Sequence, residues 1–389
     1  MNASHSTPST VLITGARAPV ALHLARLFHG AGWRVVMADS VRHPISAASA
    51  CCSRYFSIPS PRFEPSQYGD AINDILTAEN PALVVPSCEE VFYLANLWMQ
   101  RRFTHPLFAP EFSLLSATHN KFKFIELCRV LKLETPDTRL VENVNDLKSY
   151  SDQAHNLVFK PVWSRFAKQI LICPSAAQLA QINPTSRMPW IAQTFVRGQE
   201  LSAYAVARNG KLVALSVYQC RYRAGQGAGI YFEPVTNGAI HKFIDLFITG
   251  TNWNGQVSFD FIEMQNGEVL PLECNPRATS GLHFFQLPTP FVDAITLRSG
   301  DGLIKRHKVP QTLPLAMWYY GLPKALRTGK MVSFLKDLNR AEHILEWPAD
   351  NGPKRGQWRS FLEMITRSMR HRSSLQQAST YDIEWNGPD

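Results

Sequence analysis

The chain has 389 residues, of which 45% are hydrophobic and 18% charged, and its net charge is +9 at pH 7. This length allows two or three domains with substantial cores, and the composition is ordinary for a globular protein. No stretch approaches the roughly 20 apolar residues that a membrane-spanning helix needs, and residues 1–10 lack the apolar run of a secretory signal. We therefore expect a protein that is neither secreted nor membrane-spanning.

The seven cysteines include no pair with C-x-x-C spacing, and several lie in apolar segments. This distribution is typical of buried thiols in a reducing compartment, so we expect a cytoplasmic protein. The positive charge is compatible with nucleic-acid or membrane contact, but enzymes of polyphosphates and anionic substrates also need basic residues. Because aromatic and basic residues are not interleaved as in RNA-binding proteins, we expect no nucleic-acid partner.

The first segments predict a βαβ unit. Residues 10–14 form an apolar strand, a turn leads into a helix that reaches about His29, and residues 34–39 form a second strand that ends in an acidic residue. A dinucleotide-binding fold begins in the same way. The glycines of its G-x-G-x-x-G loop are absent here, since residues such as Arg17 fill the loop, and a nicotinamide cofactor is therefore disfavoured.

A further parallel strand is predicted at 81–86, after a helix over 68–78, and a short strand at 108–110. Ligands of open α/β sheets bind at the carboxyl edge of the strands. Glu89 or Glu90, just beyond this strand, is therefore a candidate for contact with an amine or hydroxyl of a substrate. The alternative is a pair of carboxylates at a helix start, where the helix dipole favours them.

Two lysines lie at the ends of predicted elements. Lys121 is near the start of a helix predicted over 116–131, and Lys160 ends a strand over 156–161. A lysine held at a strand end is a compact point charge suited to phosphate. The loop that follows, 162–168, contains no glycine but offers polar and cationic side chains.

Two hairpins and a cationic loop come next. Residues 190–200 form a strand and a turn, and residues 201–217 form a hairpin whose Asn209-Gly210 pair favours a type I′ turn. The segment 221–229 is predicted to be a flexible, glycine-rich, cationic loop. It is not a P-loop, because no G-K-[ST] follows and no helix starts there.

The most informative segment is a hairpin with acidic residues, centred on an Asn-Gly turn at 266–267. One strand places Asp260 among apolar neighbours, and the other places Glu273 and Asn275 two positions apart, on one face. Two carboxylates and an amide oxygen are hard ligands that suit Mg²⁺. Arg277 follows two positions later, which suggests a site for a metal-bound polyphosphate. The alternative is a hairpin held by ion pairs.

Beyond this hairpin the pattern changes. His283, after a loop of small residues, is a candidate base or substrate-orienting group, although a lone histidine is more often structural. Residues 352–372 form a basic amphipathic helix with an apolar face. Two interpretations stay open for this helix, which are weak contact with a membrane surface and packing on the protein body with a solvated cationic face.

Asp260 together with the Glu273-Cys-Asn275-Pro-Arg277 run resembles the metal-binding signature of the ATP-grasp superfamily, which includes biotin carboxylase, carbamoyl phosphate synthetase and the carboxylate-amine ligases. The preceding elements follow the order of that family. The resemblance covers about residues 10–300 and implies an α/β plus α+β fold. It predicts a Rossmann-like pre-ATP-grasp domain at 10–115 and an ATP-grasp domain at 116–300, with a lid at about 155–192. Residues 301–389 form a C-terminal extension that no family motif describes.

The resemblance also implies roles for individual residues, and we state them as expectations. ATP, with Mg²⁺ or Mn²⁺, is the expected cofactor. The metal ligands would be Asp260, Glu273 and Asn275. The ATP-binding residues would be Lys121, Lys160, Ser164, Arg165, Lys168, Gln193, Phe195, Val196 and Glu200. The catalytic residues would be Arg277 and Arg221, and the substrate-binding residues Arg223, Ser280, Gly281, His283 and Glu89.

The implied function is that of an ATP-dependent ligase, which activates a carboxylate as an acyl phosphate and joins it to an amine with release of ADP and phosphate. Biotin carboxylase itself is disfavoured, because the loop after Arg277 reads Ala-Thr-Ser-Gly rather than the Gln-Val-Glu-His type. The partners would be small-molecule carboxylates and amines, and a homodimer stays open. The alternatives are an ATP-binding regulatory or scaffold protein without catalysis and, less favoured, a nicotinamide-dependent reductase.

Overall fold

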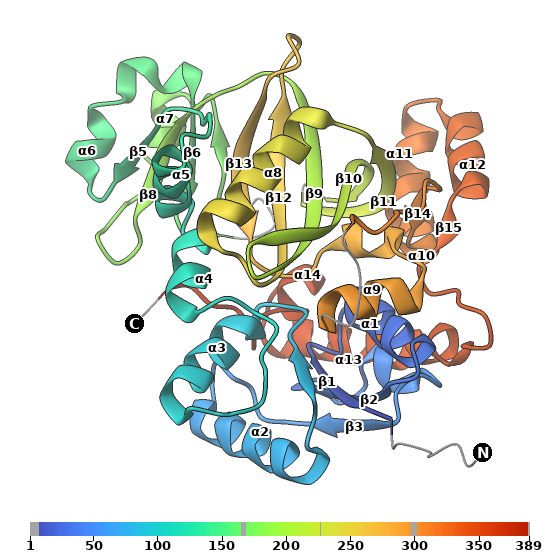
Figure 1. The fold of residues 1–389 in the computed structure, drawn as a ribbon. Coiled ribbons are helices and arrows are strands. Elements are labelled where there is room, and N and C mark those ends of the chain that lie inside the picture. The colour runs from blue at the N-terminus through green and yellow to red at the C-terminus, as the bar shows by residue number, and fades with distance from the viewer. Residues whose placement is uncertain (1–7, 165–168, 226, 297–301, 388–389) are drawn as a thin grey trace, which may run out of the picture.

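The structure, a computed structural model, describes residues 8–164, 169–225, 227–296 and 302–387. Three β-sheets organise the chain, and Figure 1 shows them from the N-terminal unit to the C-terminal helices. Within the described ranges, none of the helices is both long enough and apolar enough to cross a membrane.

The N-terminal unit is a parallel sheet with the order β3-β2-β1-β4. Its strands are β1 (Thr10–Thr14), β2 (Arg34–Asp39), β3 (Arg54–Ser57) and β4 (Leu83–Val85), and its helices are α1 (Pro19–Gly30), η1 (Ile45–Ala48), α2 (Pro65–Glu79) and α3 (Glu90–Arg101). Alternate residues such as Val11 and Leu12 belong to different hydrophobic clusters, so both faces are buried, as expected of a parallel sheet. The predicted βαβ unit is confirmed, but the predicted strand at 108–110 is only a bridge between Leu107 and Val84.

The helix predicted over 116–131 is wrong as a single element. The chain instead forms α4 (Phe112–His119) and α5 (Lys121–Val130). Asn120 adopts an extended conformation between them, and its side chain accepts hydrogen bonds from the backbone N–H groups of Phe122 and Lys123. Asparagine at an N-cap satisfies such groups well. The break places Lys121 at the first position of α5.

A small antiparallel sheet, with the order β5-β8-β6-β7, follows in the region predicted as the lid. Its strands are β5 (Thr138–Val141), β6 (Leu157–Pro161), β7 (Leu171–Ile172) and β8 (Trp190–Thr194), with α6 (Val144–Lys148), η2 (Ser151–Asn156) and α7 (Ala176–Leu179) around them. Phe159 and Trp190 belong to a separate hydrophobic cluster beneath this sheet.

The largest sheet has the order β13-β12-β9-β10-β11-β14-β15. Its strands are β9 (Gln199–Arg208), β10 (Lys211–Ala224), β11 (Ala228–Val235), β12 (Gly255–Glu263), β13 (Val269–Asn275), β14 (Gln311–Thr312) and β15 (Glu342–His343). Helices α5 and α8 (Gly238–Thr251) contribute residues to one core with this sheet, and α1, η3 (Ser280–Phe284) and α9 (Pro288–Thr296) contribute to another. The predicted hairpin at 201–217 and the predicted acidic hairpin around residues 266–267 are both confirmed.

The predicted loop at 221–229 is wrong for most of its length. Strand β10 extends to Ala224 and β11 starts at Ala228, so only residues 225–227 lie between them, and residue 226 is outside the described residues. Tyr222 and Tyr231 oppose each other across the pair, and cross-strand aromatic pairs stabilise sheets. Gly229 fits because a Cβ there would lie 2.6 Å from the sulfur of Cys220. One of the glycines that suggested a loop, Gly229, therefore permits close strand pairing.

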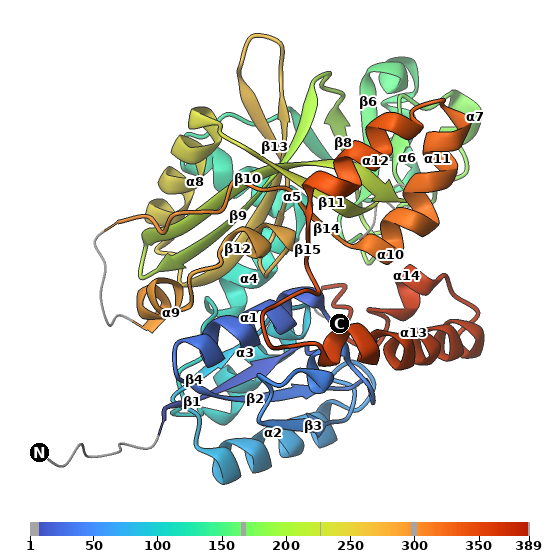
Figure 2. The same cartoon turned by 90° about the vertical axis from the view of Figure 1, so that its right-hand side faces the viewer.

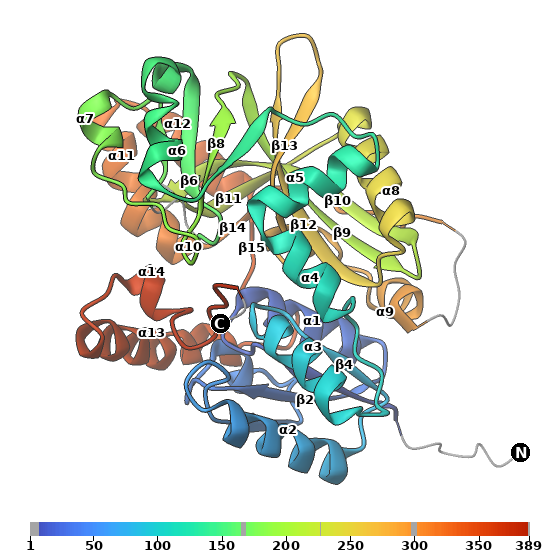
Figure 3. The same ribbon diagram turned by 90° about the vertical axis from the view of Figure 1, so that its left-hand side faces the viewer.

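The C-terminal extension divides into two parts (Figure 2). The first consists of α10 (Pro314–Ala316), the π-helical turn η4 (Met317–Gly321), α11 (Leu322–Arg327) and α12 (Met331–Arg340). It packs on the large sheet through a cluster that includes Met317, Phe334 and Tyr231. The second consists of α13 (Gly352–Arg370) and α14 (Leu375–Ala378), which lie beside the N-terminal unit in Figure 3.

Candidate active site

The acidic hairpin brings the three predicted metal ligands together. Asp260 on β12 is directly opposite Glu273 on β13, and Ser258 is opposite Asn275. The Asp260 carboxylate accepts hydrogen bonds from Ser202 Oγ at 2.6 Å and from Asn275 Nδ2 at 3.3 Å. Burial, together with the neighbouring charge of Glu273, raises the pKa of Asp260. A divalent cation between the two carboxylates would remove this repulsion.

The chemistry of the donor set therefore fits Mg²⁺ or Mn²⁺. Carboxylate and amide oxygens are the ligands that these hard ions prefer. Within the described ranges, no group of three or more histidine, cysteine or acidic side chains could hold a metal ion. Asp260 and Glu273 would thus supply two carboxylates, Asn275 an amide oxygen, and a nucleotide or water the other ligands.

Two buried lysines converge on the same hairpin from other elements. Lys121 of α5 donates to the carbonyl of Ser164 at 2.9 Å and lies 3.4 Å from Glu273 Oε2. Lys160 of β6 donates to the carbonyl of Leu272 at 3.1 Å. Burial lowers the pKa of Lys160 to about 8, although Glu273 acts in the opposite direction. The two ammonium groups thus face a carboxylate across the gap between the small and large sheets.

The charge of Glu273 depends on these lysines. Burial by itself would raise the pKa of Glu273, but Lys121 and Lys160 outweigh it, and the pKa is lowered. Both lysines are almost fully buried, being 3% and 5% exposed, which is costly for a cation unless it has an anionic partner. The arrangement can therefore bind further negative charge next to the carboxylates, in particular phosphate with a metal ion.

The loop after β6 is only partly described. The Ser164 carbonyl holds Lys121, and Ser164 Oγ donates to the Pro161 carbonyl at 3.3 Å. Arg165 and Lys168, which we expected to contact ATP, lie outside the described residues.

The residues predicted to bind adenine and ribose follow β8. Gln193 is buried and donates to Thr138 Oγ1 at 2.9 Å, so its amide nitrogen is used within the small sheet. The Phe195 N–H donates to the Asn156 carbonyl at 2.9 Å, and Val196, which follows it, is half-buried. Glu200 is exposed at the start of β9 and pairs with Arg223. The structure therefore leaves the carbonyl of the Gln193 side chain and the carboxylate of Glu200 as the groups most suited to a nucleoside.

The structure separates the two arginines that we expected to act together. Arg223 Nη2 lies 2.5 Å from Glu200 Oε2, on the side of the acidic hairpin. Arg221 lies 3.1 Å from Asp337 of α12 and 3.8 Å from Glu233 of β11. Register shifts between Cys220 and Arg223 change which side chains share a face. The structure thus does not support the catalytic role expected for Arg221, and Arg223 takes its place as the candidate.

Arg277 and Glu89 meet at the opposite end of the site. Arg277 Nε lies 3.8 Å from Glu89 Oε1, and its Nη2 donates to Asn275 Oδ1 at 3.4 Å. Glu89 follows β4 and is 3% exposed. Glu90 is instead bonded within the N-terminal unit, where it accepts from Thr14 Oγ1 at 2.8 Å. The prediction that a carboxylate at this sheet edge faces the site therefore applies to Glu89.

Two of the expected substrate-binding residues prove to be core residues. His283 is 2% exposed and packs edge-on against His23, with 5.1 Å between ring centroids. Burial, followed by the neighbouring His23, lowers the pKa of His283 far below its usual value. A Cβ at Gly281 would lie 2.5 Å from the Cβ of Tyr204. The turn η3 folds both residues beneath the large sheet, whereas Ser280 stays half-buried at its start.

Sequence analysis missed two contributors to the site. Ser202, two residues after Glu200 on β9, orients Asp260, and the alternation of strand residues could have identified it. The C-terminal tail also reaches the site, because the Trp385 N–H donates to Glu89 Oε2 at 3.4 Å and its ring stacks on Phe92. No local pattern in the sequence indicates this contact.

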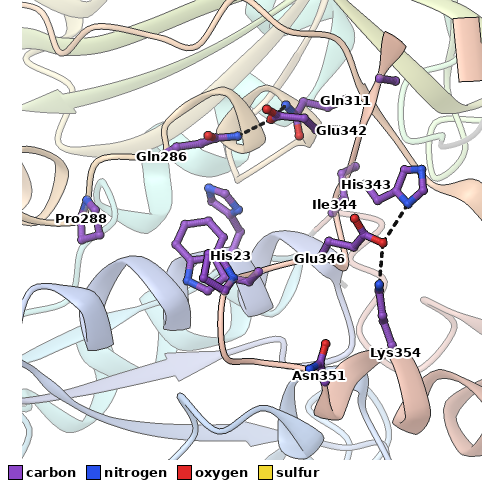
Figure 4. Close-up of a pocket in the computed structure, with 13 residues that line it drawn as sticks. His23, Gln286, Pro288, Gln311, Glu342, His343, Ile344, Glu346, Asn351 and Lys354 are labelled. Carbon is purple, nitrogen blue, oxygen red and sulfur yellow. Dashed lines mark hydrogen bonds and ion pairs between the residues drawn. The ribbon is translucent and has the colours of Figure 1, made fainter. Parts of the chain in front are cut away.

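A cavity of about 770 Å³ lies elsewhere, between α1, β15 and α13 (Figure 4). Its carboxylates are already bonded. Glu342 accepts from Gln286 and Gln311, and Glu346 from Lys354. None of the residues that we expected to bind ATP, metal or substrate lines this cavity, so we place the candidate site by its convergent charges rather than by the volume of a cavity.

Comparisons with known proteins agree with this geometry. Residues 118–281 match the model of the ATP-grasp domain family. The fold is similar to N5-carboxyaminoimidazole synthetase from Staphylococcus aureus, with a TM-score of 0.63 and 13% identity over 79% of this chain and 83% of that chain. It is similar to an L-amino acid ligase from Bacillus licheniformis, with a TM-score of 0.61 and 13% identity over 77% and 78%.

A third similar structure is the biotin carboxylase domain of Hydrogenobacter thermophilus 2-oxoglutarate carboxylase, with a TM-score of 0.60 and 12% identity over 78% of this chain and 72% of that chain. A comparison with curated proteins found no match. At such identities the structural likeness shows the fold alone, and it confirms the predicted architecture.

Proposed function

We propose that the chain is an ATP-dependent ligase that joins a carboxylate to an amine, and the match of residues 118–281 to the model of the ATP-grasp domain family supports this proposal. The observation that supports this proposal is the convergence of Lys121 and Lys160 on the opposed carboxylates of Asp260 and Glu273. Such a set binds a metal-bound polyphosphate and can neutralise charge that develops during phosphoryl transfer.

The reaction has two steps in this proposal. A carboxylate oxygen of the substrate bonds to the γ-phosphorus of ATP, and the bond from that phosphorus to the β–γ bridging oxygen breaks, releasing ADP. The nitrogen of an amine then attacks the acyl carbon, phosphate leaves with the bonding electrons, and the nitrogen loses a proton to give an amide. When bound, Mg²⁺ or Mn²⁺ polarises phosphoryl oxygens.

The residues of the chain would divide the work by position. Lys121 and Lys160 would bind the nucleotide phosphates, because both are held rigidly at element ends. Glu200 would accept hydrogen bonds from the ribose. Arg223 would contact the transferred phosphoryl group. Arg277 would hold the acceptor carboxylate, because the Arg277 side chain lies between Asn275 and Glu89.

The substrates in this proposal are small molecules. The similar structure from Bacillus licheniformis is named an L-amino acid ligase, and that from Hydrogenobacter thermophilus is a dimer in complex with MgADP and bicarbonate. In this proposal Glu89, which is buried and lies 3.8 Å from Arg277, would bind the cationic end of an amine or an amino acid. The seven cysteines are free, which supports a cytoplasmic location, and a homodimer would follow the pattern of the second structure.

The alternatives have less support. A nicotinamide reductase would use the acidic residue at the end of β2 to bind a ribose, but Asp39 is engaged by Arg17, whose Nη2 lies 2.5 Å from Asp39 Oδ1. A non-catalytic scaffold would bind ATP through the same lysines. The presence of all three expected metal ligands, Asp260, Glu273 and Asn275, argues against a scaffold.

ADP release in the presence of pooled amino acids, other carboxylic acids and amines tests the proposal. We expect Glu273→Gln to reduce ADP release by about 100-fold or more, because a metal ligand and its charge are lost. Glu268→Gln is the matched control, since Glu268 is exposed at the turn of the same hairpin. ATP binding without ADP release under all substrate pools would favour a scaffold, and equal activity of both variants would contradict the site.

A further inference from the structure

Two segments of the C-terminal extension have a high density of positive charge. Residues 324–340 and 354–372 contain eleven lysine or arginine residues and two acidic residues, so their excess equals the whole net charge of +9. The remainder of the chain is therefore neutral overall. A charge excess confined to two helical segments indicates a surface that attracts an anionic partner.

The two acidic residues of these segments face inward. Glu363 of α13 accepts hydrogen bonds from the backbone N–H groups of Arg42 and His43, at 2.8 and 2.7 Å. Asp337 of α12 is 5% exposed and accepts from Tyr222 Oη at 2.8 Å. Carboxylates of other segments pair with Arg340, Lys354 and Arg367, and the other cations of the two segments form a cationic outward surface.

Helix α13 has apolar residues on the face opposite its packed face. Gly356 packs on η1, because a Cβ at this position would lie 2.6 Å from the Cβ of Ala48. Glu363 lies on the same packed face and accepts from the N–H of Arg42. Trp358, Leu362 and Met369 are spaced by four and seven residues, which places them on one stripe about half a turn away from the packed face. Their exposed fractions are 57%, 61% and 68%.

Cations flank this stripe. Arg355, Arg359 and Arg370 lie on one side of it, by the periodicity of the helix, and all three are exposed. Lys354 lies on the other side, where it pairs with Glu346. A helix with an apolar face bordered by lysine and arginine is typical of elements that lie in the plane of a membrane interface. Here the helix is already anchored to the protein by its other face, so the exposed stripe is not needed for the fold.

The other part of the extension has the same character. Within the described residues, eleven of the twenty exposed large apolar side chains lie in 315–369. Those of the first part are Leu315, Trp318, Tyr319, Tyr320, Leu326, Val332 and Leu335. The exposed cations among them are Lys324, Arg327, Lys330 and Lys336. Helices α11, α12 and α13 lie on the same side of the molecule in Figures 2 and 3.

We propose that this side of the C-terminal extension docks on an anionic membrane surface, with the apolar stripe of α13 inserted among the lipid headgroups. The proposal is independent of the ligase function. A second copy of the chain is disfavoured as the occupant, because a symmetric contact through α13 would bring like charges together. A lipid surface is favoured over a compact acidic protein, because two separate basic and apolar patches share one side and can contact an extended plane together.

Flotation of the full chain with vesicles tests the proposal. We expect binding to vesicles of phosphatidylcholine and phosphatidylglycerol, weak binding to phosphatidylcholine alone, and loss of binding when the salt concentration rises from about 0.05 M to about 0.5 M. The variant Arg355→Gln/Arg359→Gln/Arg370→Gln should weaken binding by about 100-fold at low salt, since each cation contributes about fivefold. The variant Trp358→Ser/Leu362→Gln/Met369→Gln should weaken it by at least about 10-fold.

Matched control variants exclude a nonspecific effect of charge or hydrophobicity. Lys123→Gln/Lys148→Gln/Lys242→Gln removes three exposed cations from other surfaces, and Val130→Ser/Met188→Gln/Leu246→Gln removes three exposed apolar side chains. Both controls should bind vesicles as the parent does. All variants should keep the thermal stability of the parent, because the substituted side chains are exposed.

Tryptophan fluorescence distinguishes insertion of the α13 stripe into the membrane from electrostatic attraction to its surface. Lipids brominated on the acyl chain should quench the parent more than the Trp358→Phe variant if the stripe inserts. The proposal is overturned if the vesicles fail to bind at low salt, or if the α13 variants bind as well as the controls. It is also overturned if the parent prefers an acidic protein to the vesicles in competition, because the surface is then a protein-binding site.

Discussion

The separation of Arg221 from Arg223 gives a sharp test of the site. Arg223 lies beside Glu200, and its charge counteracts the effects of burial and Glu273, which raise the pKa of Asp260. Arg221 instead pairs with Asp337 at 3.1 Å. We expect Arg223→Ala to impair phosphoryl transfer and Arg221→Ala to leave it almost unchanged, although the two residues are separated by only one position in β10.

The magnitudes follow from exposure and distance. Removal of a group that stabilises charge in a transition state typically costs 10²–10³-fold in rate, and we expect about 100-fold for Arg223→Ala, because its side chain is 33% exposed and screened by water. The Arg221 side chain is 41% exposed. Loss of its ion pair should reduce the free energy of unfolding by only about 1 kcal/mol and change ADP release by less than about twofold.

The assay measures ADP release and thermal unfolding of both variants in parallel, with Arg223→Lys as a third variant. Lysine keeps the charge but not the planar fork of donors, so we expect it to recover part of the activity. The reasoning is refuted if Arg221→Ala loses activity as severely as Arg223→Ala, or if Arg223→Ala loses stability and activity in equal proportion.

Two further predictions concern how the C-terminal extension is held. Arg26→Met should reduce the free energy of unfolding by about 3–5 kcal/mol, measured by urea denaturation. Arg26 is fully buried 2.8 Å from Asp350, so its loss leaves a buried carboxylate unpaired. A smaller loss in Arg26→Met/Asp350→Asn than in the single variant would support this explanation. Burial would raise the pKa of Asp382, but Arg17 and Arg367 outweigh burial and lower this pKa. The ionised Asp382 therefore stabilises the folded state at pH values above the pKa of an unfolded aspartate, about 3.9, and this stabilisation is lost as the pH falls below that value. The stability deficit of Asp382→Asn should therefore shrink between about pH 5 and pH 3 in thermal unfolding, and a constant deficit would count against the ion pair.

Local sequence patterns were sufficient to predict most of the architecture. The apolar runs of β1, β2 and β4 predicted a parallel sheet, and the Asn-Gly turns at 209–210 and 266–267 predicted two hairpins that the structure contains. Strand periodicity also placed Asp260, Glu273 and Asn275 together. These features depend on residues close in sequence, where turn geometry and side-chain alternation leave few alternatives.

Predictions failed where a distant contact decided the outcome. Its glycines suggested that segment 221–229 is a loop, but pairing of β10 with β11 makes most of this segment strand. The irregular register of the pair separates Arg221 from Arg223. His283 follows a loop of small residues and was therefore a candidate for the active site, yet η3 packs it against His23, which is 260 residues earlier in the chain.

The sequence by itself determined which residues could hold a metal ion and phosphate, because carboxylate, amide and lysine side chains at fixed strand positions limit the chemistry. Only the tertiary structure decided that Arg223 pairs with Glu200 and Arg221 with Asp337. It also decided that Glu89 lies near Arg277, whereas Glu90 bonds to Thr14. It also decided that the C-terminal tail contacts Glu89 through Trp385. The physical reason is that these outcomes depend on packing between segments far apart in the chain, and local propensity contains no information about such contacts.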